Sequence, residues 1–138
     1  MLARELMHEG VECVGEHESL RQVAERMRDL DVGCMPICGE DDKLHGVITD
    51  RDIVLQCCAE GRHPTQMEAG DLAQGAPVWI SADANEDQVL ELMAENRIKR
   101  LPVIEDGRLV GMISEVDIAR HLPADKVARM AEAVYAGR

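Results

Sequence analysis

The stretch GVITDRD, residues 46–52, and the stretch GMISEVD, residues 111–117, follow one pattern. Each has a glycine, two apolar residues typical of a strand, a hydroxyl residue, and an aspartate three positions after the hydroxyl. A hydroxyl followed at that spacing by a carboxylate is typical of the first turn of a helix. The two stretches therefore predict two copies of one strand-to-helix junction.

The duplication extends over most of the chain. Equivalent residues lie 65 or 66 positions apart, in the pairs Ala3/Ala69, Leu6/Leu72, Val23/Val89, Met27/Met93, Pro36/Pro102 and Gly46/Gly111. Stacked repeat arrays need three or more units to bury a core, so two copies at this long period argue against a solenoid. The copies instead predict a pseudo-twofold pair that packs face to face.

Each copy is expected to have the element order β-α-β-β-α, which makes the fold α+β. Periodicity predicts a short strand, an amphipathic helix, two strands and a second helix, at residues 12–14, 20–30, 35–38, 44–48 and 49–60 of the first copy. The second copy repeats these elements at residues 78–80, 89–93, 101–104, 109–113 and 114–122. The pair Asp106-Gly107 predicts a tight hairpin turn.

These elements divide the chain into three parts. The first copy occupies residues 1–62, the second copy residues 67–123, and a further helix residues 124–138, all within one integrated module. The last helix has an apolar face formed by Val127, Met130, Ala131 and Val134. An isolated helix of this length is marginal in water, so that face should dock on the body of the protein or on a second subunit.

Composition excludes several classes of function. The chain has 138 residues and a formal net charge of −12, with one Trp and one Tyr. Nucleic-acid binders carry basic patches and stacking aromatic residues, so nucleic acid is not expected as a partner. No apolar run has the roughly 18 to 20 residues that a membrane span needs, and residues 1–10 do not resemble a signal peptide. We therefore expect a cytoplasmic protein that does not contact membranes.

Five cysteines form no Cys-x-x-Cys pair, and their odd number favours reduced core thiols. Cys13 and Cys38 lie in the first and second predicted strands of the first copy. If the helix between these strands is a crossover, the strands are parallel neighbours and the two sulfurs are either buried thiols or a disulfide.

A zinc site needs four ligands, and no such set is evident, so no metal is expected. The five histidines have no visible nucleophile or base partner, so no enzyme is expected.

The two junctions have two interpretations. In one, Thr49 with Asp52, and Ser114 with Asp117, are only helix caps. In the other, they form a nucleotide cradle. The hydroxyl lies where unpaired backbone N–H groups attract phosphate, and the carboxylate accepts two hydrogen bonds from a ribose diol. Recurrence of the pattern in both copies favours the cradle.

These motifs resemble the cystathionine-β-synthase (CBS) domain, and the chain as a whole resembles a stand-alone pair of such domains, or Bateman module. The resemblance covers about residues 2–123. Within the family, the stretches GEHE (15–18), TDRDIV (49–54) and DIARHLP (117–123) resemble the short actinobacterial hypoxic-response type. The resemblance implies two sheets related by pseudo-twofold symmetry, with two ligand clefts between the repeats. It also implies that two molecules pair into a homodimer.

The resemblance further implies a ligand. CBS pairs bind adenosyl compounds such as AMP, ADP, ATP, S-adenosylmethionine or NAD-like molecules, which act as regulatory ligands and not as cofactors. The implied roles are ribose binding by Asp52 and Asp117, phosphate binding by Thr49 and Ser114, and an adenine pocket near Val14, Ile37, Ile80 and Val103.

The two copies differ in charge. Residues 97–100 of the second copy read RIKR, whereas their equivalents at 31–34 read DVGC. An acidic chain needs local cations to hold a polyphosphate, and the candidates are Lys99, Arg100 and Arg51. Alternatively these cations are only solvated surface charges.

Two functions of different classes follow. The first is a non-enzymatic regulatory module that senses an adenosyl ligand and acts on another, unknown effector protein. The second is a ligand-free stress-response interaction protein that works through cysteine redox or a metal.

Overall fold

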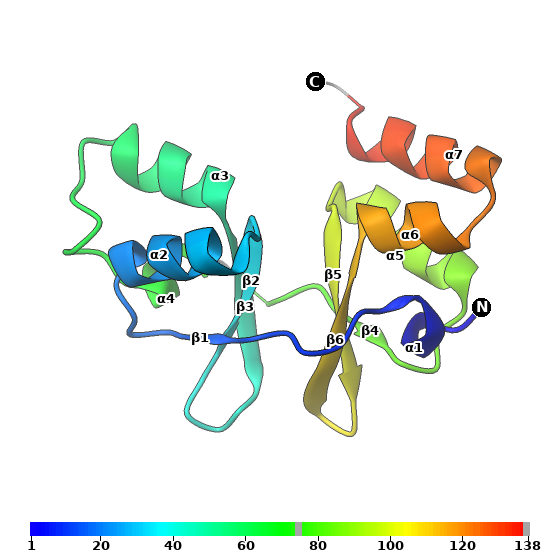
Figure 1. The fold of residues 1–138 in the computed structure, drawn as a ribbon, viewed down its shortest axis with the longest axis horizontal. Coiled ribbons are helices and arrows are strands. Elements are labelled where there is room, and N and C mark those ends of the chain that lie inside the picture. The colour runs from blue at the N-terminus through cyan, green and yellow to red at the C-terminus, as the bar shows by residue number, and fades with distance from the viewer. Residues whose placement is uncertain (74–75, 137–138) are drawn as a thin grey trace. The chain divides into compact units, whose positions relative to one another are not determined.

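The structure is a computed structural model and describes residues 1–73 and 76–136, so residues 137–138 of the predicted last helix lie outside the described residues (Figure 1). The chain forms two compact units, which are described separately. Unit 1 contains Met1–Val11 and Val78–Arg138, and unit 2 contains Glu12–Pro77. The first eleven residues therefore pack with strands of the second sequence copy, an exchange that the repeat pattern does not predict.

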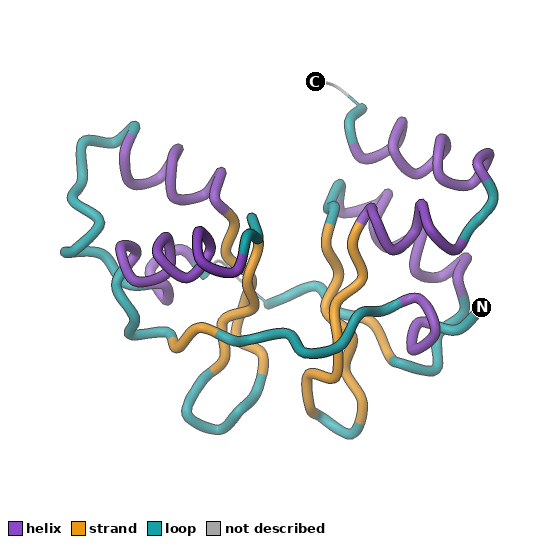
Figure 2. The backbone as a smooth tube through the Cα atoms, in the orientation of Figure 1, coloured by secondary structure: helices purple, strands orange, loops and turns teal. Residues whose placement is uncertain are grey.

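Unit 2 contains a three-stranded sheet in the order β1-β2-β3 (Figure 2). Strand β1 (Val14–Gly15) pairs in parallel with β2 (Cys34–Cys38), which pairs in antiparallel fashion with β3 (Leu44–Thr49). The parallel pairing confirms the predicted crossover, which is helix α2 (Leu20–Leu30). Buried residues of α2 and the sheet form one apolar core, with Leu20, Val23, Ile37 and Ile48 fully buried.

The second helix of unit 2 begins as predicted but changes from an α-helix to a π-helix. Helix α3 (Asp50–Ile53) continues into the π-helix η1 (Val54–Cys58). Both α2 and α3 lie on one side of β2 and β3 (Figure 1). Within η1, Cys57 is buried, whereas Val54 and Leu55 are exposed.

Unit 1 repeats this arrangement. Its sheet has the order β4-β5-β6, built from β4 (Ile80–Ser81), β5 (Arg100–Glu105) and β6 (Arg108–Ser114). Between β5 and β6, Asp106 and Gly107 have φ values of 51° and 77°, so they form the expected tight hairpin turn. Helices α5 (Glu86–Asn96) and α6 (Glu115–His121) lie on one side of this sheet (Figure 1).

Each unit also contains a short helix that periodicity does not predict, α1 (Ala3–Leu6) in unit 1 and α4 (Ala69–Leu72) in unit 2. The two are equivalent in the repeat, and both bury an alanine and a leucine. Helix α1 binds the turn before α5, because the N–H of Ala3 donates to the carbonyl of Ala84 at 2.7 Å. Four residues are too few to show an amphipathic period, which is why the pattern misses them.

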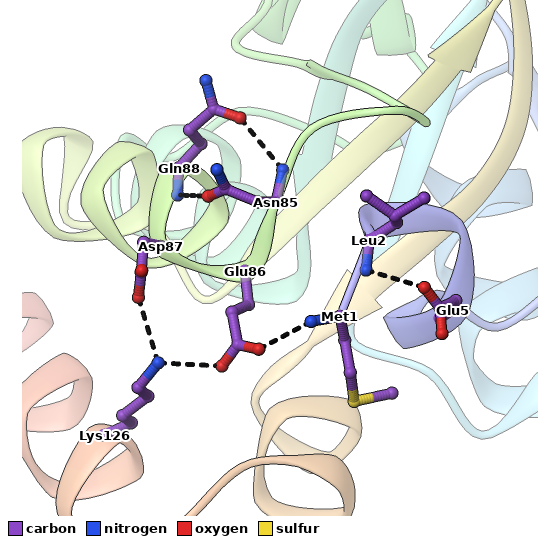
Figure 3. Close-up of polar contacts among 8 residues, drawn as sticks. All are labelled: Met1, Leu2, Glu5, Asn85, Glu86, Asp87, Gln88 and Lys126. Carbon is purple, nitrogen blue, oxygen red and sulfur yellow. Dashed lines mark hydrogen bonds and ion pairs between the residues drawn. The ribbon is translucent and has the colours of Figure 1, made fainter.

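The last helix, α7 (Ala124–Val134), docks on α5 within unit 1. Met130 and Val134 are buried in the unit 1 core, and Val127 packs against that core. Polar contacts join the start of α7 to the start of α5. Lys126 Nζ lies 2.9 Å from Glu86 Oε2 and 3.1 Å from Asp87 Oδ1 (Figure 3). The predicted apolar face of this helix therefore covers the body of the same chain.

Candidate functional site

Both junctions are capped helix starts, as the cap interpretation predicts. In unit 2, the backbone N–H of Thr49 donates to Asp52 Oδ2 at 2.9 Å, and the N–H of Asp52 donates to Thr49 Oγ1 at 3.1 Å. Gln56 Nε2 lies 3.4 Å from the other carboxylate oxygen of Asp52. The side chain of Asp52 is half-buried, so this carboxylate has a solvent-facing part.

The equivalent carboxylate in unit 1 is more enclosed, since Asp117 is 7% exposed. Its Oδ2 atom accepts hydrogen bonds from the N–H and the hydroxyl of Ser114, both at 2.8 Å, and lies 2.7 Å from His8 Nδ1. Burial acts to raise the pKa of Asp117, but the hydrogen bonds from His8 and Ser114 outweigh burial and lower that pKa below its usual value. Asp117 is therefore a buried, ionised carboxylate.

Strand pairing places one of the second-copy cations beside this junction. Arg100 is the cross-strand partner of Ser114 in the β5–β6 pair. In unit 2, the corresponding partner of Thr49 is Cys34. Directly opposite residues of an antiparallel pair lie about 4.5 to 5.5 Å apart, so Arg100 adds a positive charge next to Ser114, where Cys34 adds none next to Thr49.

The candidate cations of unit 1 already have partners. Lys99 Nζ lies 4.6 Å from the centre of the Tyr135 ring, and Tyr135 donates a hydrogen bond to Glu115 Oε1 at 3.3 Å. The guanidinium of Arg100 lies 3.9 Å from the same Glu115 oxygen. A phosphate group at this position would have to compete with Glu115. Arg51 of unit 2 is exposed, and its contact with a phosphate stays a prediction.

The glycine of each junction motif has a packing role. A Cβ atom on Gly111 would lie 2.6 Å from Met7 Sδ and 2.8 Å from the His8 carbonyl oxygen. At Gly46 the same atom would lie 2.9 Å from the Cβ of Ala73. Each glycine therefore allows the segment after α1 or α4 to approach the third strand of its sheet. In unit 1 this approach brings His8 to Asp117.

The predicted adenine-pocket residues lie in pairs on neighbouring strands. Val14 faces Ile37 in the β1–β2 pair, and Ile80 faces Val103 in the β4–β5 pair. All four are buried in the apolar cores of their own units. Contact of any of them with an adenine ring stays a prediction.

Cys13 and Cys38 form a disulfide, with their Cα atoms 5.7 Å apart. Of the two outcomes left open for this pair, the bridge is the one found. It joins the ends of two neighbouring parallel strands, since β1 begins at the residue after Cys13 and β2 ends at Cys38. The other cysteines, Cys34, Cys57 and Cys58, are outside disulfides.

Sequence reasoning missed three residues of the unit 1 site, namely His8, Glu115 and Tyr135. His8 lies 109 residues from Asp117 in the chain, and Tyr135 lies 20 residues from Glu115. A signal for His8 existed in the repeat pairs Ala3/Ala69 and Leu6/Leu72, which place the preceding segment inside the repeating unit. No comparable signal exists for Tyr135, because α7 has no counterpart in the first copy.

Residues 1–73 and 76–136 offer neither a ready-made metal site nor a membrane-spanning helix. In that part of the chain, no group of three or more His, Cys, Asp or Glu side chains is arranged to hold a metal ion. Its helices are all too short or too polar to cross a membrane.

The fold and the doubled junction define a pair of CBS domains, and the chain belongs to the CBS domain family. The family model matches residues 3–57 and 69–124. Hypoxic response protein 1 of Mycobacterium tuberculosis is 46% identical over 132 residues, which cover 96% of this chain and 92% of that protein. The chain is therefore a CBS-domain regulatory module similar to hypoxic response protein 1.

Solved structures agree with this assignment. The crystal structure of Hypoxic Response Protein I with two coordinated zinc ions matches with a TM-score of 0.82 and 49% identity, covering 89% of this chain and all of that one. A hexameric CBS-CP12 protein from bloom-forming cyanobacteria matches with a TM-score of 0.78 and 24% identity, covering 88% of this chain and 70% of that one. The second match supports the fold alone.

Proposed function

We propose that this protein is a non-enzymatic sensor of an adenosyl ligand, which binds at the junction of Ser114 and Asp117 and at that of Thr49 and Asp52. The observation that carries the proposal is the buried, ionised carboxylate of Asp117, which binds Ser114, whose cross-strand partner is the cation Arg100. A carboxylate accepts hydrogen bonds from a ribose diol, and a guanidinium binds phosphate. Membership of a family whose pairs bind adenosyl compounds supports the same ligand class.

The direct test is calorimetry with adenosine, AMP, ADP, ATP, S-adenosylmethionine and NAD at fixed ionic strength. The ligand is a regulatory molecule, so the assay measures binding and needs no turnover. Micromolar-range affinity for at least one of these compounds is the expected result. If none binds and none raises the melting temperature at millimolar concentration, the sensor proposal is wrong.

The charge of Arg100 should select phosphorylated ligands. We expect Arg100→Ala to weaken ATP binding several-fold more than adenosine binding, with a difference that shrinks as salt rises, because screening weakens exposed charge pairs. Cys34→Ala is the matched control, since Cys34 has the equivalent position in unit 2 and carries no charge. Equal losses for ATP and adenosine in Arg100→Ala would show that the arginine supports the fold and not the ligand.

A homodimer is the second part of the proposal. Exposed apolar side chains lie on the second helix of both units, with Val54 and Leu55 on η1 and Val116 on α6. Helices that expose large apolar residues are typical of subunit interfaces. A cyanobacterial protein with the same fold is described as hexameric.

Light scattering at tens of micromolar should give the mass of a dimer. The double change Val54→Asp/Leu55→Asp should shift it to a monomer, because two buried charges would be added on each side of a twofold interface. Leu30→Asp is the control, since Leu30 is an exposed apolar residue on α2, outside the proposed interface. A wild-type monomer at this concentration would contradict the dimer.

The alternative function, stress response through cysteine redox or a metal, rests on two observations. Cys13 and Cys38 are bridged, and the structure of a relative is described with two coordinated zinc ions. Within one chain, the described residues offer no ready-made group of metal ligands. Zinc therefore belongs in the binding panel as the competing ligand, and binding of zinc without any adenosyl compound would favour this alternative.

A further inference from the structure

The position of His8 is fixed by backbone pairing and not by its side chain. The N–H of His8 donates to the carbonyl of Met112 at 2.9 Å, and the N–H of Met112 donates to the carbonyl of His8 at 3.1 Å. Gly111 makes this approach possible, because a Cβ there would meet the His8 carbonyl oxygen. Backbone pairing with β6 therefore holds His8 beside Asp117, and the His8 side chain is 50% exposed.

This imidazole uses the carboxylate that ribose would use. Asp117 Oδ2 takes three hydrogen bonds, two from Ser114 and one from His8 Nδ1 at 2.7 Å. A ribose diol donates two hydroxyl hydrogens and binds best when both carboxylate oxygens can accept. Since the bonds from Ser114 cap helix α6, the contact that can yield to a ligand is the one with His8.

We propose that His8 gates the Asp117 carboxylate, so that the affinity of this site for ribose rises with pH. The inference rests on the proposed adenosyl function. The hydrogen bond from His8 to the ionised Asp117 is charge-assisted in either protonation state, and a charged imidazolium adds an ion-pair attraction to it. Histidine is the side chain that ordinarily changes charge between pH 5 and 8, so protonation closes the carboxylate to ribose and deprotonation opens it.

Other charged groups on the elements packed around His8 either contact other residues or are exposed to solvent. On α1, Arg4 forms ion pairs with Asp83 and Glu105, and the Glu5 carboxylate accepts from the N–H of Leu2. On α6, Glu115 contacts Tyr135, and His121 donates to the main-chain carbonyl of Asp117 at 2.7 Å, not to its carboxylate. Glu9 next to His8, Arg108 on β6 and Arg120 on α6 are exposed side chains. Asp117 is thus the carboxylate that His8 contacts.

The dependence on pH should be found at the Asp117 site and not at the Asp52 site. The residue equivalent to His8 in the other copy, 66 positions later, is Gln74, which does not titrate and lies outside the described residues. Asp52 is half-buried and accepts one hydrogen bond on each oxygen. Ribose binding through Asp52 should therefore be independent of pH between 5.5 and 8.

The test uses adenosine, because it carries no phosphate and no charge in this pH range. In an Asp52→Ala background, which leaves the Asp117 site, adenosine affinity is measured by calorimetry at pH 5.5 and pH 8.0. We expect the adenosine affinity to rise several-fold, because deprotonation of His8 removes its ion-pair attraction to Asp117 and leaves only the hydrogen bond. His8→Gln in the same background should make the affinity equal at both pH values. His121→Gln is the matched control and should leave the rise unchanged.

The outcomes separate the gate from the proposed function. Adenosine binding that appears only in His8→Gln would show that His8 blocks the carboxylate at both pH values, and it would overturn the pH dependence. A rise that persists in His8→Gln, or binding without any rise in the Asp52→Ala parent, would overturn the gate and leave the adenosyl function standing. No adenosine binding by wild type, parent or His8→Gln would overturn both. Melting temperatures of all variants verify that each is folded at both pH values.

Discussion

Asp117→Ala is expected to weaken adenine nucleotide binding by about 10- to 100-fold, the equivalent of one charge-assisted hydrogen bond. The carboxylate is buried and ionised, so its loss removes the acceptor for the ribose hydroxyls. Calorimetry with ATP and adenosine measures the effect, and both ligands should lose affinity by a similar factor, because ribose is common to them.

The same substitution removes the carboxylate half of the capping box of α6, in which Ser114 is the N-cap, so its effect on folding must be measured separately. Loss of an N-terminal cap typically costs about 0.5 to 2 kcal/mol. Because the folded-state pKa of Asp117 lies below its ordinary value of 3.8, this stabilisation is present above that pH and is lost as pH falls through the folded-state pKa. Wild type and Asp117→Ala should therefore converge in stability in strong acid.

The control for charge is Glu95→Ala, which removes one negative charge from an exposed position on α5. Asp52→Ala tests the second site in the same way as Asp117→Ala tests the first. If Asp117→Ala lowers the melting temperature and both single variants retain full nucleotide affinity, the two aspartates are helix caps and nothing more.

Reduction of the Cys13–Cys38 bridge is expected to lower the free energy of unfolding of unit 2 by about 3 kcal/mol, or roughly 150-fold in the unfolding constant. The bridge closes a loop with a sequence separation of 25, and the loss of loop-closure entropy in the unfolded chain accounts for an effect of this size. Urea unfolding with and without a thiol reductant, followed by hydrogen exchange resolved along the chain, measures it. Amides of unit 1 should change little.

The double variant Cys13→Ala/Cys38→Ala is the control, because reductant should have no further effect on it. Thiol titration of the unfolded wild type without reductant should find three of the five cysteines reactive. Five reactive thiols would show that the bridge does not form, and the pair would then be two thiols on neighbouring strands.

Local sequence signals predicted the parts of the fold that depend on short spacings. The capped junctions at Thr49 and Ser114, the crossover helix α2 and the Asp106-Gly107 turn all follow from residues within a few positions of each other. Within the candidate site, the contact between Ser114 and Asp117 follows from the same local rule. Its ligand role stays a prediction, because a helix cap and a ribose acceptor need the same two residues.

Long-range packing accounts for what could not be predicted. Helices α1 and α4 are four residues long, which is too short to show a helical period in the sequence. They are stabilised by burial against a turn. The contact between His8 and Asp117 depends on which of the two sheets the first eleven residues pack against. The sequence does not decide between the sheets, because each has a glycine in its third strand that allows another segment to approach closely. The contacts of Tyr135 depend on where α7 docks, and its apolar face is compatible with several surfaces.

The exchange of the first eleven residues has a consequence for synthesis on the ribosome. Unit 2 is one continuous segment, Glu12–Pro77, so all its strands and helices are available while the rest of the chain is still being made. Unit 1 needs Met1–Val11 together with Val78–Arg138, so residues 1–11 stay without their partners until residues that are made much later become available. Contacts between such distant residues slow folding, because a long loop must close before they form. During that interval the unpaired segment with Ala3 and Leu6 exposes apolar surface that a chaperone or a neighbouring nascent chain can bind.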